Sequence, residues 1–497
     1  MIPRLTVPAV LALVAGTFAA AATSQTTTDP LSAIDWLSRS VEDRVRPANA
    51  AISAGPGGAA VPAVTTTALA EAGPAALGAI SPETAGLPAN LWTGDDIDRI
   101  ERLLAQIDGP TLPALTDLLV RLLLSSAVAP DGATGRLMQA RVDTLLRLGL
   151  LPQALALLEA ADPVSDPALF RRWFDAALLT GSEDRTCAAM QANPALAPTV
   201  PARVFCQARS GDWPGAALTL NTHRALGDLD TSQETLLVRF LDPELAEDED
   251  TDATDGQMTP LDFQMRRAIG AGVATGRLPL AFAHADLADT VGVKTRLEAA
   301  ERLARHGALP APALAQLFLS GRPSASGGTW DLMRAMQAFD TAVREEDADT
   351  LSEVLPPLWG QLSAIRAEPL LAELYADRLP TLDPDARPFA VRLANLAGLS
   401  PEGTPPLIAA LIDGDPATQG VASSVEEAIV AAFAEPAPMV QDGTYGAHLL
   451  AAISQLEAAV AGDGPAITEG LVALRAAGQD STARAVAVQL LILDRRS

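Results

Sequence analysis

Residues 148–227 contain one pattern three times, as LGLLPQALALLEA at 148–160, LTGSEDRTCAAMQA at 179–192 and RSGDWPGAALTLNTHRA at 209–225. In each copy an apolar run ends at a glycine, and a second run begins with a small residue five positions later. The glycines are Gly149, Gly181 and Gly211, and the small residues are Ala154, Thr186 and Ala216. Glycine fits the left-handed position that ends a helix, and a small residue lets the next helix pack closely. The stretch therefore predicts consecutive helical hairpins.

The spacing of these glycines resembles that of a known class of helical repeat. They lie 32 and 30 residues apart, close to the ~34-residue unit of tetratricopeptide arrays. A fourth copy, LRAAGQDSTARAVAVQLLIL at 474–493, contains Gly478 and Ala483. We therefore expect an all-α protein, an α-solenoid of antiparallel helical hairpins that is tetratricopeptide-like.

Composition supports helices and argues against some partners. Apolar residues make up 48% of the chain but aromatic residues only 4%, and alternating runs of β-branched residues are nearly absent, which favours helices over sheets. The formal net charge is −26, which would repel phosphate backbones and anionic lipid. We expect no nucleic acid partner.

The first 22 residues have the features of an export signal. Arg4 precedes the apolar run LTVPAVLALVAGTFAAAA, which ends in small residues with an expected cleavage site after Ala22. An uncleaved anchor is the alternative. The next most apolar segment, 112–129, carries Asp117 and Arg121, so we interpret it as protein core rather than a membrane span. These features predict a periplasmic protein with no stable membrane insertion after cleavage.

A short amphipathic segment follows at 23–45, and a stretch rich in Pro, Ala and Gly follows that at 46–91. The apolar residues at helical spacing in the first segment, with a tryptophan beside them, are Leu31, Ile34, Trp36, Leu37 and Val41. A helical peptide on a disordered tether suggests a motif that docks in the groove of a partner. Alternatively, the helix folds back and caps its own solenoid.

The remaining chain divides at an acidic segment. We expect helical-repeat block 1 at 92–241, a linker at 242–258 with many carboxylates, and helical-repeat block 2 at 259–497. The linker lacks the ligand spacing of a calcium-binding loop, so a solvated linker is the better interpretation.

Cys187 and Cys206 are the two cysteines, and they fall on consecutive expected helices. In an oxidising compartment this placement predicts a disulfide bond. A pair of buried free thiols is the alternative.

No local motif for catalysis is present. The four histidines show no zinc-binding spacing, and His284 lies among small apolar residues, where a hydrogen-bonded core histidine is expected. We predict no catalytic residue, metal or cofactor. Trp173, Phe174, Phe205 and Trp213 are expected in the core between helices.

Several segments together resemble a group of uncharacterised exported proteins of α-proteobacteria. They are DPLSAIDWLSRSV, LFRRWFDAALLTGSEDRTC and PARVFCQARSGDW, together with the signal peptide and the Pro/Ala tether. Some such proteins carry the automatic label "antifreeze glycopeptide polyprotein", which implies long Ala-Ala-Thr repeats that this chain lacks. The resemblance implies no activity and no functional residues.

The sequence thus predicts a non-enzymatic periplasmic scaffold or adaptor that binds protein partners in a cell-envelope complex. Two alternatives remain open at this point. One is an enzyme acting on peptidoglycan, and the other is a module that binds a small ligand or calcium. The partner and the oligomeric state are not indicated by the sequence.

Overall fold

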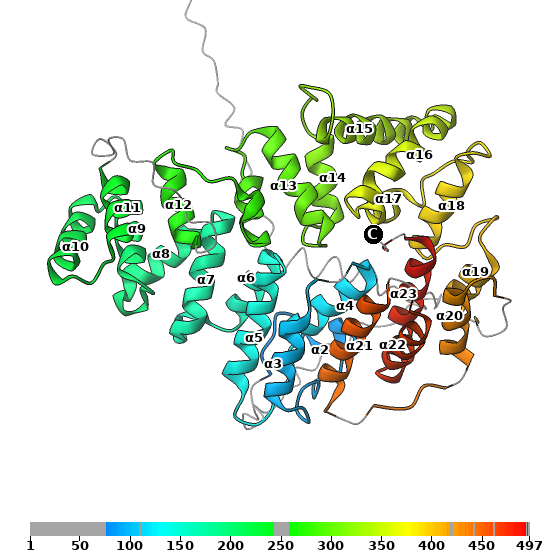
Figure 1. Cartoon of the computed structure of the whole chain (residues 1–497), viewed down its shortest axis with the longest axis horizontal. Coiled ribbons are helices and arrows are strands. Elements are labelled where there is room, and N and C mark those ends of the chain that lie inside the picture. The colour runs from blue at the N-terminus through cyan, green and yellow to red at the C-terminus, as the bar shows by residue number, and fades with distance from the viewer. Residues whose placement is uncertain are drawn as a thin grey trace, which may run out of the picture.

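The computed structural model describes residues 76–109, 111–242, 258–414, 416, 421–434, 436–440, 443–460, 463–493 and 495 of the 497-residue chain (Figure 1). Its regular structure is helical. In the described part of the chain, β pairing is limited to two isolated bridges, Leu77 with Ala127 and Ile80 with Ser125. The prediction of an all-α fold is therefore confirmed.

The helices follow one another with short connections. The first half contains α2 (Pro82–Ala85), α3 (Ile97–Gln106), α4 (Pro113–Leu124), α5 (Thr134–Arg147), α6 (Leu151–Ala160), η1 (Pro163–Ser165), α7 (Pro167–Thr180), α8 (Glu183–Ala192), η2 (Pro194–Leu196), α9 (Val200–Arg209), α10 (Trp213–Leu226) and α11 (Thr231–Leu241). The second half contains α12 (Pro260–Ala268), η4 (Thr275–Arg277), η5 (Leu280–Leu287), α13 (Val293–Arg305), α14 (Ala311–Leu319), α15 (Thr329–Glu345), α16 (Ala348–Ala364), α17 (Glu368–Tyr375), α18 (Arg387–Leu396), α19 (Pro406–Asp413), α20 (Ser424–Ala434), α21 (Tyr445–Ala459), α22 (Gly464–Ala476) and α23 (Asp480–Ile492).

The repeated glycine pattern has the structural role that the sequence predicts. Gly149, Gly181, Gly211 and Gly478 have φ angles of 73°, 71°, 86° and 75°, in the left-handed region. The small residues five positions later, Ala154, Thr186, Ala216 and Ala483, are fully buried at 0% exposure. In each pair the glycine ends one helix, and the small residue lets the next helix pack closely against it.

The chain runs outward and then turns back. Helices α5 to α11 each contact the next helix in the sequence, and α8 to α11 form the end of the molecule at the left of Figure 1. The return begins with α12, which packs against α7, and continues with η5, which packs against α7 and α13. The end of the molecule is thus built from two separate passes of the chain.

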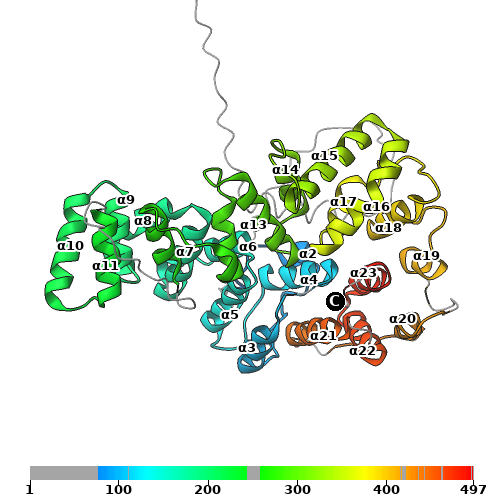
Figure 2. The same cartoon turned by 45° about the horizontal axis from the view of Figure 1, so that its top comes forward.

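The last helices close the chain onto the first ones. Helix α21 packs against α3, and α23 packs against α4 (Figure 1); Figure 2 shows the same neighbours after a turn of 45°. Backbone hydrogen bonds join the two ends, from the amide of Gly94 to the Gly443 carbonyl at 2.8 Å and from the amide of Gly446 to the Leu91 carbonyl at 2.9 Å. A Cβ on Gly446 would lie 2.1 Å from the Trp92 ring, so glycine is required there.

A buried ion pair completes this closure. Arg495, near the C-terminus, donates two hydrogen bonds of 2.9 Å to the two carboxylate oxygens of Glu368 at the start of α17. Both side chains are only 1% exposed. Arg495 also donates to the Thr111 carbonyl at 3.4 Å, between α3 and α4. The pair therefore joins three parts of the chain that are far apart in the sequence.

One core cluster includes residues of both expected blocks, 92–241 and 259–497, such as Leu118 and Leu450, and a second cluster lies within 259–497 alone. Order also begins before residue 92: α2 lies inside the stretch expected to be a disordered tether, and its neighbour Leu91 is fully buried. The amphipathic segment 23–45 and most of the acidic linker, 243–257, lie outside the described residues.

The apolar segment at 112–129 belongs to the protein core. Helix α4 buries six leucines against neighbouring helices, as the sequence predicts. Among the helices that the structure describes, none is both long and apolar enough to cross a membrane.

Candidate functional site

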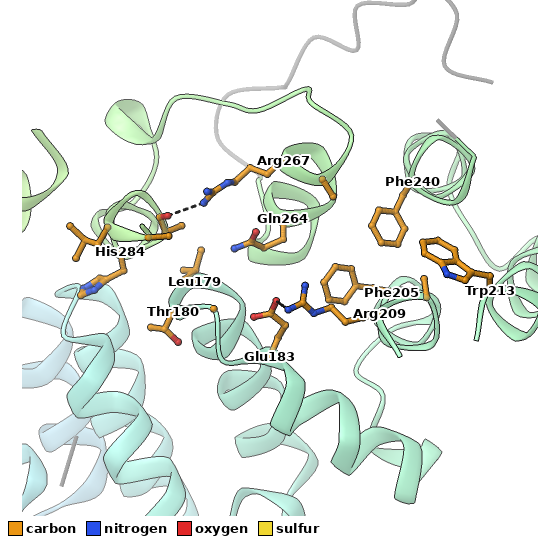
Figure 3. A pocket seen from close by; sticks show the side chains of 16 residues that line it. Leu179, Thr180, Glu183, Phe205, Arg209, Trp213, Phe240, Gln264, Arg267 and His284 are labelled. Atoms are coloured by element: carbon orange, nitrogen blue, oxygen red, sulfur yellow. Dashed lines mark hydrogen bonds and ion pairs between the residues drawn. The ribbon is translucent and has the colours of Figure 1, made fainter. Parts of the chain in front are cut away.

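A groove of ~740 Å³ opens where the outgoing and returning passes of the chain meet. One side comes from the end of α7, the start of α8, α9 and the facing ends of α10 and α11, and the other side comes from α12 and η5 (Figure 3). Its size lies in the range of ligand-binding clefts. The side chains labelled in Figure 3 are Leu179, Thr180, Glu183, Phe205, Arg209, Trp213, Phe240, Gln264, Arg267 and His284.

Aromatic side chains form one wall of the groove. Phe205 and Phe240 stack with ring centroids 5.6 Å apart, which fixes α9 against α11. Trp213 lies beside them at the first position of α10 and is 50% exposed. The prediction that the four aromatic residues are core holds for Trp173, Phe174 and Phe205, which are buried, but is wrong for Trp213. Trp213 stays exposed because α10 is outermost and buries only Ala216 and Leu220.

An ion pair lies at the N-terminal end of α8. Arg209 on α9 contacts the carboxylate of Glu183 at 2.9 Å and that of Asp184 at 3.0 Å. Glu183 is 6% exposed, and its Oε2 atom is buried without a hydrogen-bond partner among the described residues. This arrangement holds the Arg209 guanidinium at the edge of the groove between the two helices.

The opposite side of the groove presents a second arginine. Arg267 on α12 donates a hydrogen bond of 2.9 Å to the Ala285 carbonyl, and its guanidinium lies 5.6 Å from the centroid of the Phe263 ring. No carboxylate in the described ranges forms an ion pair with it. Gln264, in the middle of α12, donates to the Leu178 carbonyl at 2.5 Å and so anchors α12 to α7. Arg267 is therefore a positioned cation with donors left for a ligand.

His284 belongs to the frame of the groove. Its Nε2 donates to the Gly149 carbonyl at 2.6 Å, and burial lowers its pKa to about 4. The imidazole is consequently neutral near pH 7, with the Nε2 tautomer fixed by this bond. The expectation of a hydrogen-bonded core histidine is confirmed. The bond ties η5 to the turn between α5 and α6.

The cysteine pair joins two of the helices that line the groove. The sulfur atoms of Cys187 on α8 and Cys206 on α9 are 1.97 Å apart, at disulfide-bond distance, and both residues are buried. Since α8 carries Glu183 and α9 carries Phe205 and Arg209, this pair joins the two helices that supply much of the groove. The pairing is the one that the sequence predicts.

Other predicted site residues are not part of this groove as described. Leu31, Ile34, Trp36, Leu37 and Val41 lie outside the described residues. No group of three or more His, Cys, Asp or Glu side chains suited to a metal ion is found in the described part of the chain.

Sequence reasoning did not identify Gln264 and Arg267 as site residues. They lie on a helix separated from α11 by the acidic segment, and nothing in the sequence shows that α12 returns to pack on α7. The only available signal was Trp213, an aromatic residue two positions after the helix-ending Gly211, in the first turn of the next helix.

Comparison of the whole chain with protein-family models, curated proteins and solved structures finds no match.

Proposed function

We propose that the protein is a non-enzymatic scaffold or adaptor that binds protein partners in a cell-envelope complex. In this proposal it is exported by a cleaved signal at 1–22 and acts in the periplasm. Its helical hairpins form a solenoid-like array whose surface carries the binding sites. The groove between the two passes of the chain is the principal site.

The observation that carries this proposal is the composition of the groove. Aromatic residues and arginine are enriched at the energetic centres of protein interfaces. Here Trp213 is half exposed beside the Phe205–Phe240 stack, and Arg209 and Arg267 lie on opposite sides. A protein segment with an apolar side chain and a carboxylate could place the apolar side chain against the aromatic residues and the carboxylate against an arginine.

The amphipathic segment at 23–45 is the second proposed interaction element. Its residues Leu31, Ile34, Leu37 and Val41 would form one apolar face of a helix, with Trp36 at the edge. A partner could then be held by two separate elements, which raises the overall affinity through effective concentration.

The test is affinity capture from envelope extracts with the mature wild-type protein and two variants. The double variant Trp213→Ala/Arg267→Ala removes both walls of the groove. Leu218→Ala is the matched control, because Leu218 is 69% exposed on α10 but does not line the groove. We expect partners that are retained by wild type and by Leu218→Ala and lost from the double variant. Identical partners in all three samples would contradict a role for the groove.

A further inference from the structure

We propose that residues 29–43 of this chain occupy the groove of the same molecule when no partner is bound. The inference rests on the proposed function, because it assigns a regulator to the groove that binds partners. The segment would compete with partners for the groove. Trp36 would lie against the aromatic wall, and the carboxylates of the segment would face Arg267.

The chemistry of the segment matches that of the groove. Residues 29–43, DPLSAIDWLSRSVED, contain four carboxylates and one arginine, with Trp36 directly after Asp35. The groove offers the half-exposed indole of Trp213, the partly buried ring of Phe240 and the guanidinium of Arg267, which forms no ion pair in the described ranges. Burying an indole against these rings removes apolar surface of both partners from water, worth roughly 25 cal/mol per Å².

The start of the described chain is connected to the groove through α5. The Leu77 carbonyl accepts a hydrogen bond of 2.9 Å from Arg141 on α5, which fixes the chain beside that helix. Helix α5 in turn contacts α7 and η5, and both of these line the groove. One helix therefore separates the entry of the chain from the site.

The intervening chain is long enough to reach. Residues 44–75 separate the segment from the described part, and an unstructured chain of this length has a root-mean-square span of about 30 Å. Such a linker gives an effective concentration on the order of millimolar. Even weak docking would then fill the groove for much of the time, and a free partner would have to displace the segment.

The competition has a measurable consequence. When only a fraction of the molecules has an empty groove, the apparent affinity for a partner falls by that fraction. Loosening the segment with Trp36→Ala should raise severalfold the capture of partners that bind the groove alone. Partners that also bind the segment would be captured less well, because the substitution weakens that second contact.

Photo-crosslinking of the mature full-length chain tests the proposal directly. p-Benzoylphenylalanine is placed at position 36, the purified protein is irradiated, and the crosslinked peptides are identified by mass spectrometry. A mixture of ¹⁴N and ¹⁵N chains separates crosslinks within one molecule from those between two. We expect same-isotope crosslinks to α9, the start of α10 or α12, with a severalfold lower yield in Arg267→Glu and no change in Leu218→Ala.

Other outcomes overturn it. Crosslinks to another surface, mixed-isotope crosslinks, or none at all would each show that the groove is not occupied in this way. Melting curves of the Arg267→Glu variant check that it folds. The position of the crosslink in the chain with Arg267 intact tests occupancy of the groove independently of that variant. If the crosslinking result contradicts docking of the segment, the capture experiment still tests the proposed function, because loss of partners from the groove variants does not depend on position 36.

Discussion

Gly149 and Gly181 have the same backbone conformation but different surroundings. Both adopt left-handed φ angles, 73° and 71°. A Cβ on Gly181 would meet nothing within 4 Å, whereas one on Gly149 would lie 2.8 Å from Cγ of Leu280 in η5. Gly149 therefore ends a helix and also receives the returning chain, which the His284 bond to its carbonyl reinforces.

This difference predicts unequal costs for the same substitution. Gly181→Ala should lower the free energy of unfolding by about 1–2 kcal/mol, the cost of the left-handed conformation. Gly149→Ala should cost about 1–3 kcal/mol more, because the methyl group overpacks against Leu280. Denaturant unfolding of the two variants measures the comparison. Equal losses would mean that η5 adjusts freely, contrary to the close packing observed.

Asp175 on α7 provides a pH-dependent prediction. Burial raises the pKa of its carboxyl from 3.8 to about 6, although Arg171 and Arg172 act in the opposite direction. Because the folded state holds this proton more tightly than the unfolded state, stability associated with Asp175 is lost as the pH rises through 6. Asp175→Asn should therefore be more stable than wild type at pH 7, by at most about 3 kcal/mol.

The pH series separates this effect from a general change in packing. The advantage of Asp175→Asn should change little between pH 7 and 6, shrink as the pH falls from 6 towards 3.8, and vanish only well below 3.8, where wild type is protonated in both states. Thermal melts of wild type and variant across this range provide the measurement. A difference that stays constant with pH would contradict the burial of the charge.

Helices were the elements most readily predicted from sequence. The runs around Gly181 and Gly211 became α7 to α10, because apolar spacing and caps are local signals. The segment around His284 lies in the expected helical-repeat block 2, yet it forms the 3₁₀ helix η5 rather than an α-helix. Its five consecutive buried residues, 281–285, are set by contacts with distant helices, which local periodicity does not reveal.

The cysteine pair is an element-scale constraint on α8 and α9. Closing a loop with a sequence separation of 19 residues should stabilise this part of the molecule by about 3 kcal/mol, mainly by restricting the unfolded chain. Cys187→Ser should therefore lower the melting temperature, and Cys206→Ser should lower it equally. Titration of the denatured, unreduced wild-type protein should find no free thiol. Finding two thiols would exclude the bond.

At the scale of the whole molecule, the sequence indicated the kind of structure but not its path. The repeated glycine pattern predicted that consecutive helices pack on one another, and α5 to α11 each contact the next helix in the sequence. The return of α12 onto α7 joins apolar faces fewer than a hundred residues apart, and the closure of α21 and α23 onto α3 and α4 joins faces hundreds of residues apart. Such faces look alike in an Ala- and Leu-rich chain. The sequence therefore did not predict which distant helices pair, or the groove that their pairing creates.

The Arg495–Glu368 pair provides the test of the closure. Arg495→Met should lower the free energy of unfolding by about 3–5 kcal/mol, because it leaves the Glu368 carboxylate buried without its partner. The double variant Arg495→Met/Glu368→Met should recover much of this loss. Lys294→Ala is the control, since Lys294 pairs with Glu298 on the surface and its loss should cost no more than about 1 kcal/mol. Equal effects of Arg495→Met and Lys294→Ala in denaturant unfolding would contradict a closed ring of contacts.

The closure also constrains the order of events after synthesis. Trp92 needs Gly446 for its packing, and the turn at Thr111 needs Arg495, so the first helices to leave the ribosome lack their neighbours until the final residues have followed. Contacts of such long sequence separation slow the search for the native state and leave apolar surface uncovered in the meantime. A nascent chain of this protein would accordingly depend on chaperones that cover its N-terminal helices. In a circular permutant that begins at α21, these helices would follow their packing partners directly in synthesis.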